Sequence, residues 1–235
     1  MKLPVQETPS YNTTLPLSQQ KIKFRPFLVK EQKNLMMARE GKNSEEIFNA
    51  ICEIVKTVTF EKVDAMKLPM ADLEYLFLQI RCKSIGETTK LNIPCKQDGC
   101  DGVATVELDL ENVSLNLENI SDTKIQISDE LMIELDWPTA KSAIKLESFE
   151  EETDAIKPML RMCMVRIFDS QEIYELKEFP DSEIDNFIES LTLDQFEKIM
   201  QFFNGIPTLE EKVNYQCPKC KTKDSMVLKG LNNFF

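Results

Sequence analysis

The chain has 235 residues, 42% of them hydrophobic and 29% charged, a composition typical of a globular protein with one large domain or two small ones. Its formal net charge is −12, with 28 basic against 40 acidic residues, which disfavours general binding to nucleic-acid backbones and to anionic membrane surfaces. It contains no histidine, which excludes a Ser-His-Asp triad, a Cys-His dyad and zinc sites with histidine ligands.

The first third of the chain is predicted to be helical after a flexible arm. Residues 1–21 are rich in Pro, Ser, Thr, Gln and Asn and have little periodicity, which favours an arm that is either free or ordered on a partner. A first helix is expected over residues 30–40, with Gly41 just beyond its end. Ser44 is expected to cap a second, amphipathic helix, and a mostly buried third helix is expected after Pro69.

The middle of the chain is predicted to form two β-hairpins. Residues 88–93 and 103–110 flank a turn, and the second of these segments alternates apolar and polar residues. A second hairpin is expected over residues 123–135, where two alternating segments surround a Ser-Asp turn.

The segment 136–206 is predicted to be mostly helical and acidic. Pro158 is expected in the first turn of a helix that runs through Phe168. Thr192 and Gln195 form the pattern of a capping box and predict the start of a further amphipathic helix. The chain ends in two phenylalanines, Phe234 and Phe235, which either pack on the core or contact a partner.

Four of the seven cysteines form two pairs, Cys95 with Cys100 and Cys217 with Cys220, each in a turn between strand-like segments. This spacing predicts a structural Zn²⁺ site with four thiolate ligands. A catalytic zinc is not expected, because four thiolates leave no position for water. A redox dithiol at Cys217 and Cys220 is the first alternative, although such motifs usually begin a helix. Free cysteines, and a zinc-ribbon regulatory or nucleic-acid-associated protein, are the others.

Three N-terminal segments and the cysteine turns resemble the baseplate hub assembly proteins of T-even-type, contractile-tail bacteriophages. The segments are FRPFLVKEQKNLMMARE (24–40), SEEIFNAICEIV (44–55) and LPMADLEYLFLQIRCKSIGE (68–87). The resemblance is strongest over residues 22–100 and at Cys217 and Cys220. It implies a late viral protein, a chaperone or minor structural component, that contacts baseplate hub proteins while the hub is built. It carries over no catalytic residue, so no enzyme activity is expected.

Together these features predict an α+β protein. We expect a flexible arm over residues 1–21, a helical unit over 22–87, a zinc-bearing antiparallel β unit made of 88–135 and 207–235, and a helical insert over 136–206. No stretch approaches the about 18 consecutive apolar residues of a membrane helix. We therefore expect no membrane or nucleic-acid partner, an oligomer or hetero-complex, and a location in the host cytoplasm or in the tail baseplate of the virion.

Overall fold

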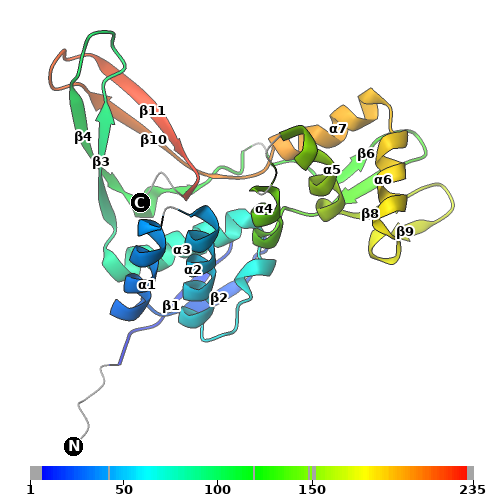
Figure 1. Ribbon diagram of the computed structural model, residues 1–235, viewed down its shortest axis with the longest axis horizontal. Helices are drawn as coiled ribbons and strands as arrows, with labels where there is room; N and C mark the ends of the chain where they lie inside the picture. The colour runs from blue at the N-terminus through cyan, green and yellow to red at the C-terminus, as the bar shows by residue number, and fades with distance from the viewer. Residues whose placement is uncertain (1–6, 42, 119, 148, 150–151, 232–235) are drawn as a thin grey trace, which may run out of the picture. The chain divides into compact units, whose positions relative to one another are not determined.

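The computed structural model describes residues 7–41, 43–118, 120–147, 149 and 152–231, and it mixes helices with small antiparallel sheets (Figure 1). This mixture confirms the predicted combination of helices and small antiparallel sheets. The first six residues of the predicted arm, and Phe234 and Phe235, lie outside the described residues. Among the described helices, none is long and apolar enough to cross a membrane.

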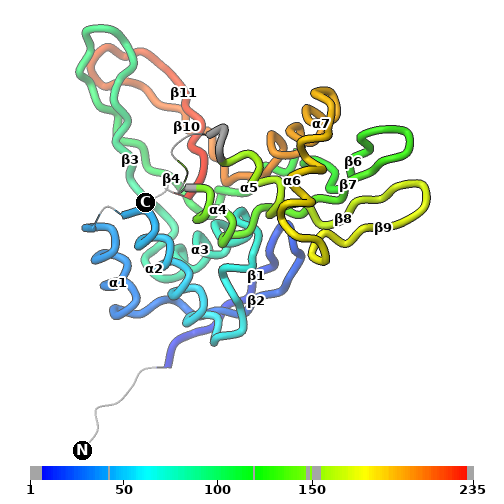
Figure 2. The backbone as a smooth tube through the Cα atoms, turned by 45° about the vertical axis from the view of Figure 1, so that its right-hand side comes forward, coloured from blue at the N-terminus to red at the C-terminus, as the bar shows by residue number. Residues whose placement is uncertain are grey.

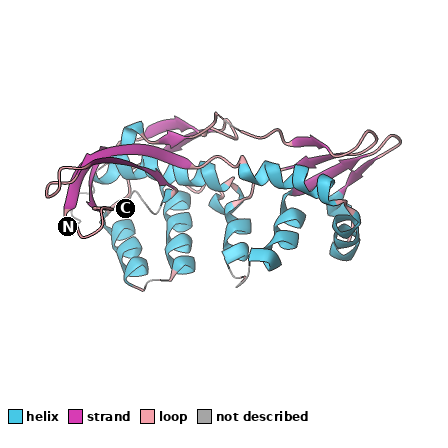
Figure 3. Ribbon diagram, turned by 90° about the horizontal axis from the view of Figure 1, so that it is seen from above, coloured by secondary structure: helices cyan, strands magenta, loops and turns pink. Residues whose placement is uncertain are grey.

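The chain forms two compact units, here called unit 1 and unit 2. Unit 1 comprises residues 1–65, 71–116 and 208–235, and unit 2 comprises residues 66–70 and 117–207. Figure 3 shows helices (cyan) and strands (magenta) in both units. The four-part division into arm, helical unit, zinc-bearing β unit and insert stays a prediction.

Unit 1 consists of three α-helices and several hairpin strands among its described residues. They are β1 (Tyr11–Thr14), β2 (Lys21–Phe24), α1 (Val29–Glu40), α2 (Ser44–Val58), α3 (Met70–Ile85), β3 (Thr88–Pro94), β4 (Val103–Asp109), β5 (Ser114–Leu115), β10 (Leu209–Gln216) and β11 (Lys223–Lys229). Helix α1 ends at Gly41 as predicted. Helix α2 is capped by Asn43, one residue before the predicted Ser44, because the Asn43 side-chain oxygen accepts the Glu45 N–H at 3.0 Å.

Strands β1 and β2 form an antiparallel hairpin near the N-terminus, with Tyr11 opposite Phe24. Leu15 in its turn is fully buried. The buried carboxylate of Asp72 on α3 accepts the backbone N–H groups of Leu17 and Ser18, each at 2.9 Å. This corrects the predicted flexible arm over its described part. The anchor lies more than 50 residues away in sequence, so local composition could not reveal it.

Two longer hairpins dominate the strand content of unit 1. Strand β3 pairs with β4 from Thr88–Asp109 to Pro94–Val103, which confirms the first predicted hairpin. Strand β10 pairs with β11, and the short β5 pairs with the start of β10. Figures 1 and 2 show the two hairpins side by side, with their turns at the same end. Both predicted cysteine turns therefore lie at this end.

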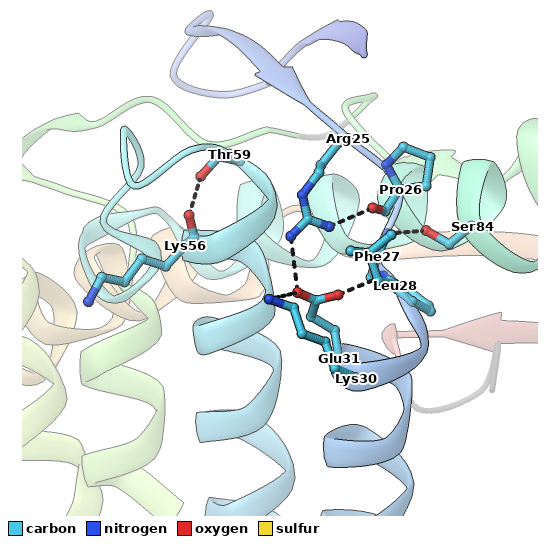
Figure 4. Close-up of polar contacts among 9 residues, drawn as sticks. All are labelled: Arg25, Pro26, Phe27, Leu28, Lys30, Glu31, Lys56, Thr59 and Ser84. Atoms are coloured by element: carbon cyan, nitrogen blue, oxygen red, sulfur yellow. Dashed lines mark hydrogen bonds and ion pairs between the residues drawn. The ribbon is translucent and has the colours of Figure 1, made fainter. Parts of the chain in front are cut away.

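A buried ion pair fixes the link between β2 and α1 (Figure 4). The Arg25 guanidinium lies 3.0 Å from the Glu31 carboxylate, and both side chains are at most 12% exposed. The other Glu31 oxygen accepts the Leu28 N–H at 2.6 Å. Burial by itself raises the pKa of Glu31, but the hydrogen bonds from Arg25 and Leu28 outweigh it and hold that pKa below its usual value. The Phe27 N–H also donates to Ser84 on α3 at 2.9 Å, so this link is fastened at both ends.

Unit 2 packs helices on an antiparallel sheet with the strand order β6-β7-β8-β9. Its elements are β6 (Lys124–Gln126), β7 (Met132–Leu135), α4 (Ala140–Glu147), α5 (Glu152–Cys163), β8 (Met164–Phe168), β9 (Ile173–Glu175), α6 (Asp181–Ser190) and α7 (Leu193–Asn204). The pairing of β6 with β7 confirms the second predicted hairpin. The core includes the fully buried Ile133, Leu160 and Ile199, and Trp137 stacks on Phe202 with 4.6 Å between ring centroids.

The predicted helix from Pro158 to Phe168 is wrong in both its start and its end. Helix α5 begins at Glu152, so Pro158 lies inside it, and the helix stops at Cys163. Residues Met164–Phe168 form β8, where Ile167 pairs with Ile133 of β7. The apolar residues of this segment suit either a helix or a strand, and pairing with β7 and β9 decides for the strand.

The start of α7 follows the sequence pattern closely. The Thr192 hydroxyl accepts the Gln195 N–H at 3.4 Å, and the Gln195 side chain accepts the Thr192 N–H at 3.0 Å. The predicted capping box is therefore confirmed.

Candidate metal centre

The four predicted cysteines lie together where the β3–β4 turn meets the β10–β11 turn. Their sulfur atoms all lie within 4.8 Å of one another. The Sγ atoms of Cys95 and Cys220 are 3.6 Å apart, and those of Cys100 and Cys217 are 3.7 Å apart. A disulfide needs about 2.05 Å, so these are free thiols grouped across two turns.

This cluster has dimensions that suit a tetrahedral metal ion. Four thiolates at about 2.3 Å from a zinc ion lie about 3.8 Å from one another. The two measured sulfur separations are close to that value. Cys217 is buried, Cys95 and Cys100 are half-buried and Cys220 is exposed, so the cluster lies at the surface with one ligand side covered. The four cysteines could therefore hold a metal ion.

Each turn is closed by its own backbone hydrogen bonds. The Cys217 N–H donates to the Thr222 carbonyl at 2.9 Å, and its carbonyl accepts the Lys221 N–H at 3.0 Å. Lys221 adopts a left-handed conformation with φ of 62°, which lets the chain reverse there. In the other turn the Cys95 N–H donates to the Gly102 carbonyl at 2.8 Å. Local backbone geometry thus presents two sulfurs from each turn.

Gly102 is required by the close approach of the two turns. A Cβ atom at this position would lie 2.5 Å from the Cys217 sulfur and 3.0 Å from the Cys lateral neighbour Lys219 Cβ. Contacts below about 3 Å are not tolerated between such atoms, so a larger residue would push the turns apart. The sequence suggested that Gly102 serves its own turn, whereas the neighbour that demands it is on the other turn.

Without a cation, the thiols hold their protons unequally. Hydrogen bonds from the side chain and backbone of Thr222 lower the pKa of Cys220 to about 6. The Gln97 backbone lowers the pKa of Cys95, but desolvation and the neighbouring thiols outweigh it and raise that pKa to about 12. Four adjacent thiolates repel one another, and a bound dication would remove this repulsion.

An ion pair between Lys219 and Asp101 also joins the two turns. The sequence suggested only that Lys219 and Lys221 offset the charge of the site, and it gave no sign of the partner carboxylate. Both side chains are well exposed, so the pair adds little to stability and mainly aligns the turns.

The position of Cys217 and Cys220 bears on the redox alternative. Reactive Cys-x-x-Cys motifs usually begin a helix, whose dipole stabilises one thiolate. Here the motif lies between strands β10 and β11 and faces two further cysteines from another hairpin. This arrangement favours metal binding over dithiol exchange.

Comparison with known proteins identifies the family. A family model described as T4 bacteriophage base plate protein matches residues 8–235. No curated protein and no solved structure matches the chain. The match spans both units and both cysteine turns, and it confirms the phage baseplate resemblance of the sequence. The chain belongs to the T4 bacteriophage base plate protein family.

Proposed function

We propose that this chain is a non-enzymatic protein that helps to build the hub of the phage tail baseplate, as a chaperone or a minor structural component. The observation that carries the proposal is the family match over residues 8–235, which supports a structural or assembly role in the baseplate. Membership also implies contacts with other baseplate proteins and a place in the virion tail. The hub as the site of action is our inference from the N-terminal resemblance.

We further propose that Cys95, Cys100, Cys217 and Cys220 hold a structural Zn²⁺. The sulfur separations of 3.6 and 3.7 Å support this, as does the close approach that only Gly102 permits. Zinc would cross-link two hairpins that are more than 100 residues apart in sequence, and its shell of four thiolates would leave no open position for chemistry. The ion thus stabilises the scaffold and leaves the partner contacts to other surfaces.

The partners that we propose are baseplate hub proteins, bound during assembly in the host cytoplasm and, for a structural component, retained in the virion. Co-expression of the tagged chain with the other tail proteins, followed by affinity purification, tests this directly. We expect at least one hub protein to co-purify in a defined ratio. Recovery of the chain alone, as a monomer, would contradict the proposal.

Two further measurements separate the roles within this proposal. Mass spectrometry of purified particles should detect the chain if it is a structural component and should miss it if it acts only as a chaperone. Metal analysis of the purified chain should give one zinc ion per chain. DNA or RNA binding that weakens with salt, or a reversible Cys217–Cys220 disulfide, would instead support the zinc-ribbon or redox alternative.

A further inference from the structure

Unit 2 contains an apolar groove between the β8–β9 hairpin and helix α6. It has a volume of about 310 Å³, and its lining includes Leu131, Tyr174, Phe179 and Phe187 together with the carboxylates of Asp169 and Glu183. Figure 2 shows α6 beside β8 and β9. This volume is at the lower end of the about 300–1,000 Å³ of small-molecule sites, so the groove suits a few side chains of a protein partner.

Hydrogen bonds hold the groove open in a fixed form. The Tyr174 hydroxyl donates to Asp169 at 2.9 Å, and the other Asp169 oxygen accepts the N–H groups of Gln171 and Glu172, each at 2.7 Å. The rings of Tyr174 and Phe179 lie 6.2 Å apart at 60°. These backbone N–H groups, with the Tyr174 hydroxyl, hold the pKa of Asp169 below its usual value, so this carboxylate is ionised at neutral pH.

The charge of the molecule is concentrated around this groove's unit. Unit 2 contains 9 basic against 21 acidic residues and thus carries the whole formal net charge of −12, while unit 1 has 19 of each and is neutral. Several cations of unit 2 already pair with its own carboxylates: Lys157, Arg161, Arg166, Lys177 and Lys198. Among the described residues, Glu183 forms no ion pair, so the groove keeps an uncompensated negative rim.

We propose that this groove binds a segment of a baseplate protein in which an apolar or aromatic residue adjoins Lys or Arg. The apolar side chain packs among Tyr174, Phe179 and Phe187, and the neighbouring cation pairs with Glu183 at the rim. The aliphatic stem of Lys or Arg also covers aromatic surface, so one segment satisfies both features of the groove. This inference rests on the proposed function, since it names the chemistry of the partner and the surface that meets it.

Peptide binding to the full-length protein tests the proposal. The probes are three fluorescent peptides: Gly-Ser-Leu-Arg-Phe-Lys-Ser-Gly, a version with Glu in place of Arg and Lys, and a version with Ser in place of Leu and Phe. Fluorescence anisotropy should detect binding of the first peptide alone, weakening as salt is raised. Equal binding of all three peptides, or binding of none, overturns the proposal.

Variants then locate the binding on the groove. We expect Glu183→Lys to weaken binding of the first peptide about tenfold, since it replaces an attraction by a repulsion, and Glu183→Gln to weaken it less. The matched control is Glu197→Lys, which makes the same charge change on the exposed face of α7, outside the groove, and should change affinity less than about twofold. Equal weakening by Glu183→Lys and Glu197→Lys would show that general charge, and not the groove, binds the peptide.

The apolar part of the groove needs its own variant. Phe187→Ala should weaken binding of the first peptide, while thermal unfolding followed by circular dichroism reports whether unit 2 stays folded. If Phe187→Ala unfolds unit 2, the exposed Glu183 variants decide the matter. Co-purification with baseplate proteins separates the two proposals: recovery that Glu183→Lys leaves unchanged overturns the groove alone, whereas no recovery even with the wild type overturns the proposed function.

Discussion

The two units of this protein are held together in different ways. Unit 1 joins distant parts of the chain through single polar or metal-binding features: the cysteine cluster, the Asp72 carboxylate and the Arg25–Glu31 pair. Unit 2 is nearly continuous in sequence, and one apolar cluster around Phe202 and Ile133 holds its sheet and helices. Unit 1 is neutral, whereas unit 2 carries the net charge.

The difference shows where each kind of change should act. A feature that joins distant segments restricts many residues at once, so its loss should loosen much of unit 1. A core built from contiguous residues loses stability in proportion to the apolar volume removed. The partner-binding chemistry that we propose lies in the charged unit, and the metal that we propose lies in the neutral one.

The largest effect should come from Cys217→Ser. Structural zinc binding contributes about 10 kcal/mol or more to the folding of small zinc domains, and one missing thiolate opens the shell. We expect the variant to lose zinc, as read by native mass spectrometry, and unit 1 to unfold at a much lower temperature.

The control for this change is Cys163→Ala in unit 2. Cys163 is buried, and burial beside Asp136 raises its pKa to about 12, so it is an unreactive thiol outside the cluster. This variant should keep one zinc ion per chain. Full zinc occupancy and unchanged stability in Cys217→Ser would show that the cysteine cluster is not a metal centre.

Truncation of the unit 2 core should produce the next largest effect. Phe202 is 1% exposed and stacks on Trp137, so Phe202→Ala should cost about 3–5 kcal/mol in the free energy of unfolding. Chemical denaturation followed by Trp137 fluorescence reports this unit, since the chain has one tryptophan. Zinc content should stay unchanged, and loss of zinc in Phe202→Ala would contradict the separation of the two units.

The Arg25–Glu31 pair should give a smaller, pH-dependent effect. Arg25→Met leaves the Glu31 carboxylate buried without its partner and should cost about 3 kcal/mol near pH 7. The pKa of Glu31 is lowered in the folded protein, so its stabilisation is present above the unfolded pKa of about 4.3 and is lost as pH falls through the folded pKa. The difference between wild type and Arg25→Met should therefore shrink below about pH 4.5.

Urea denaturation at a series of pH values measures this difference. Lys198→Met is the control, because its pair with Asp194 is exposed and should contribute less than about 0.5 kcal/mol. A stability difference for Arg25→Met that grows on acidification would contradict the assignment to the Glu31 carboxylate.

The smallest effect should come from Thr192→Ala at the start of α7. Loss of the hydroxyl that accepts the Gln195 N–H should cost about 1 kcal/mol, read from the same unit 2 fluorescence transition. Thr192→Ser keeps a hydroxyl cap and should stay close to the wild type. Equal losses in both variants would point to the methyl group rather than to the cap.

The sequence predicted those features whose cause is local. The Thr192 capping box is written within four residues, and the cysteine turns are recognisable from their spacing. It failed where distant contacts decide. Leu15 is buried because Asp72 and α3 receive its turn, and Met164–Phe168 is a strand because β7 and β9 lie on either side.

The groove of unit 2 was also beyond local sequence reasoning. Tyr174 and Phe187 belong to separate elements and suit an ordinary core equally well. Only the pairing of β8 with β9 and the packing of α6 place them around one space beside Glu183.

Hydrogen exchange of the zinc-loaded and zinc-stripped protein tests the central claim, a metal clip confined to unit 1. We predict that removal of zinc raises amide exchange in β3, β4, β10 and β11 (residues 88–109 and 209–229) and leaves unit 2 protected around Ile133 and Ile199. Unchanged exchange in the two hairpins, or an equal loss of protection in both units, would contradict it.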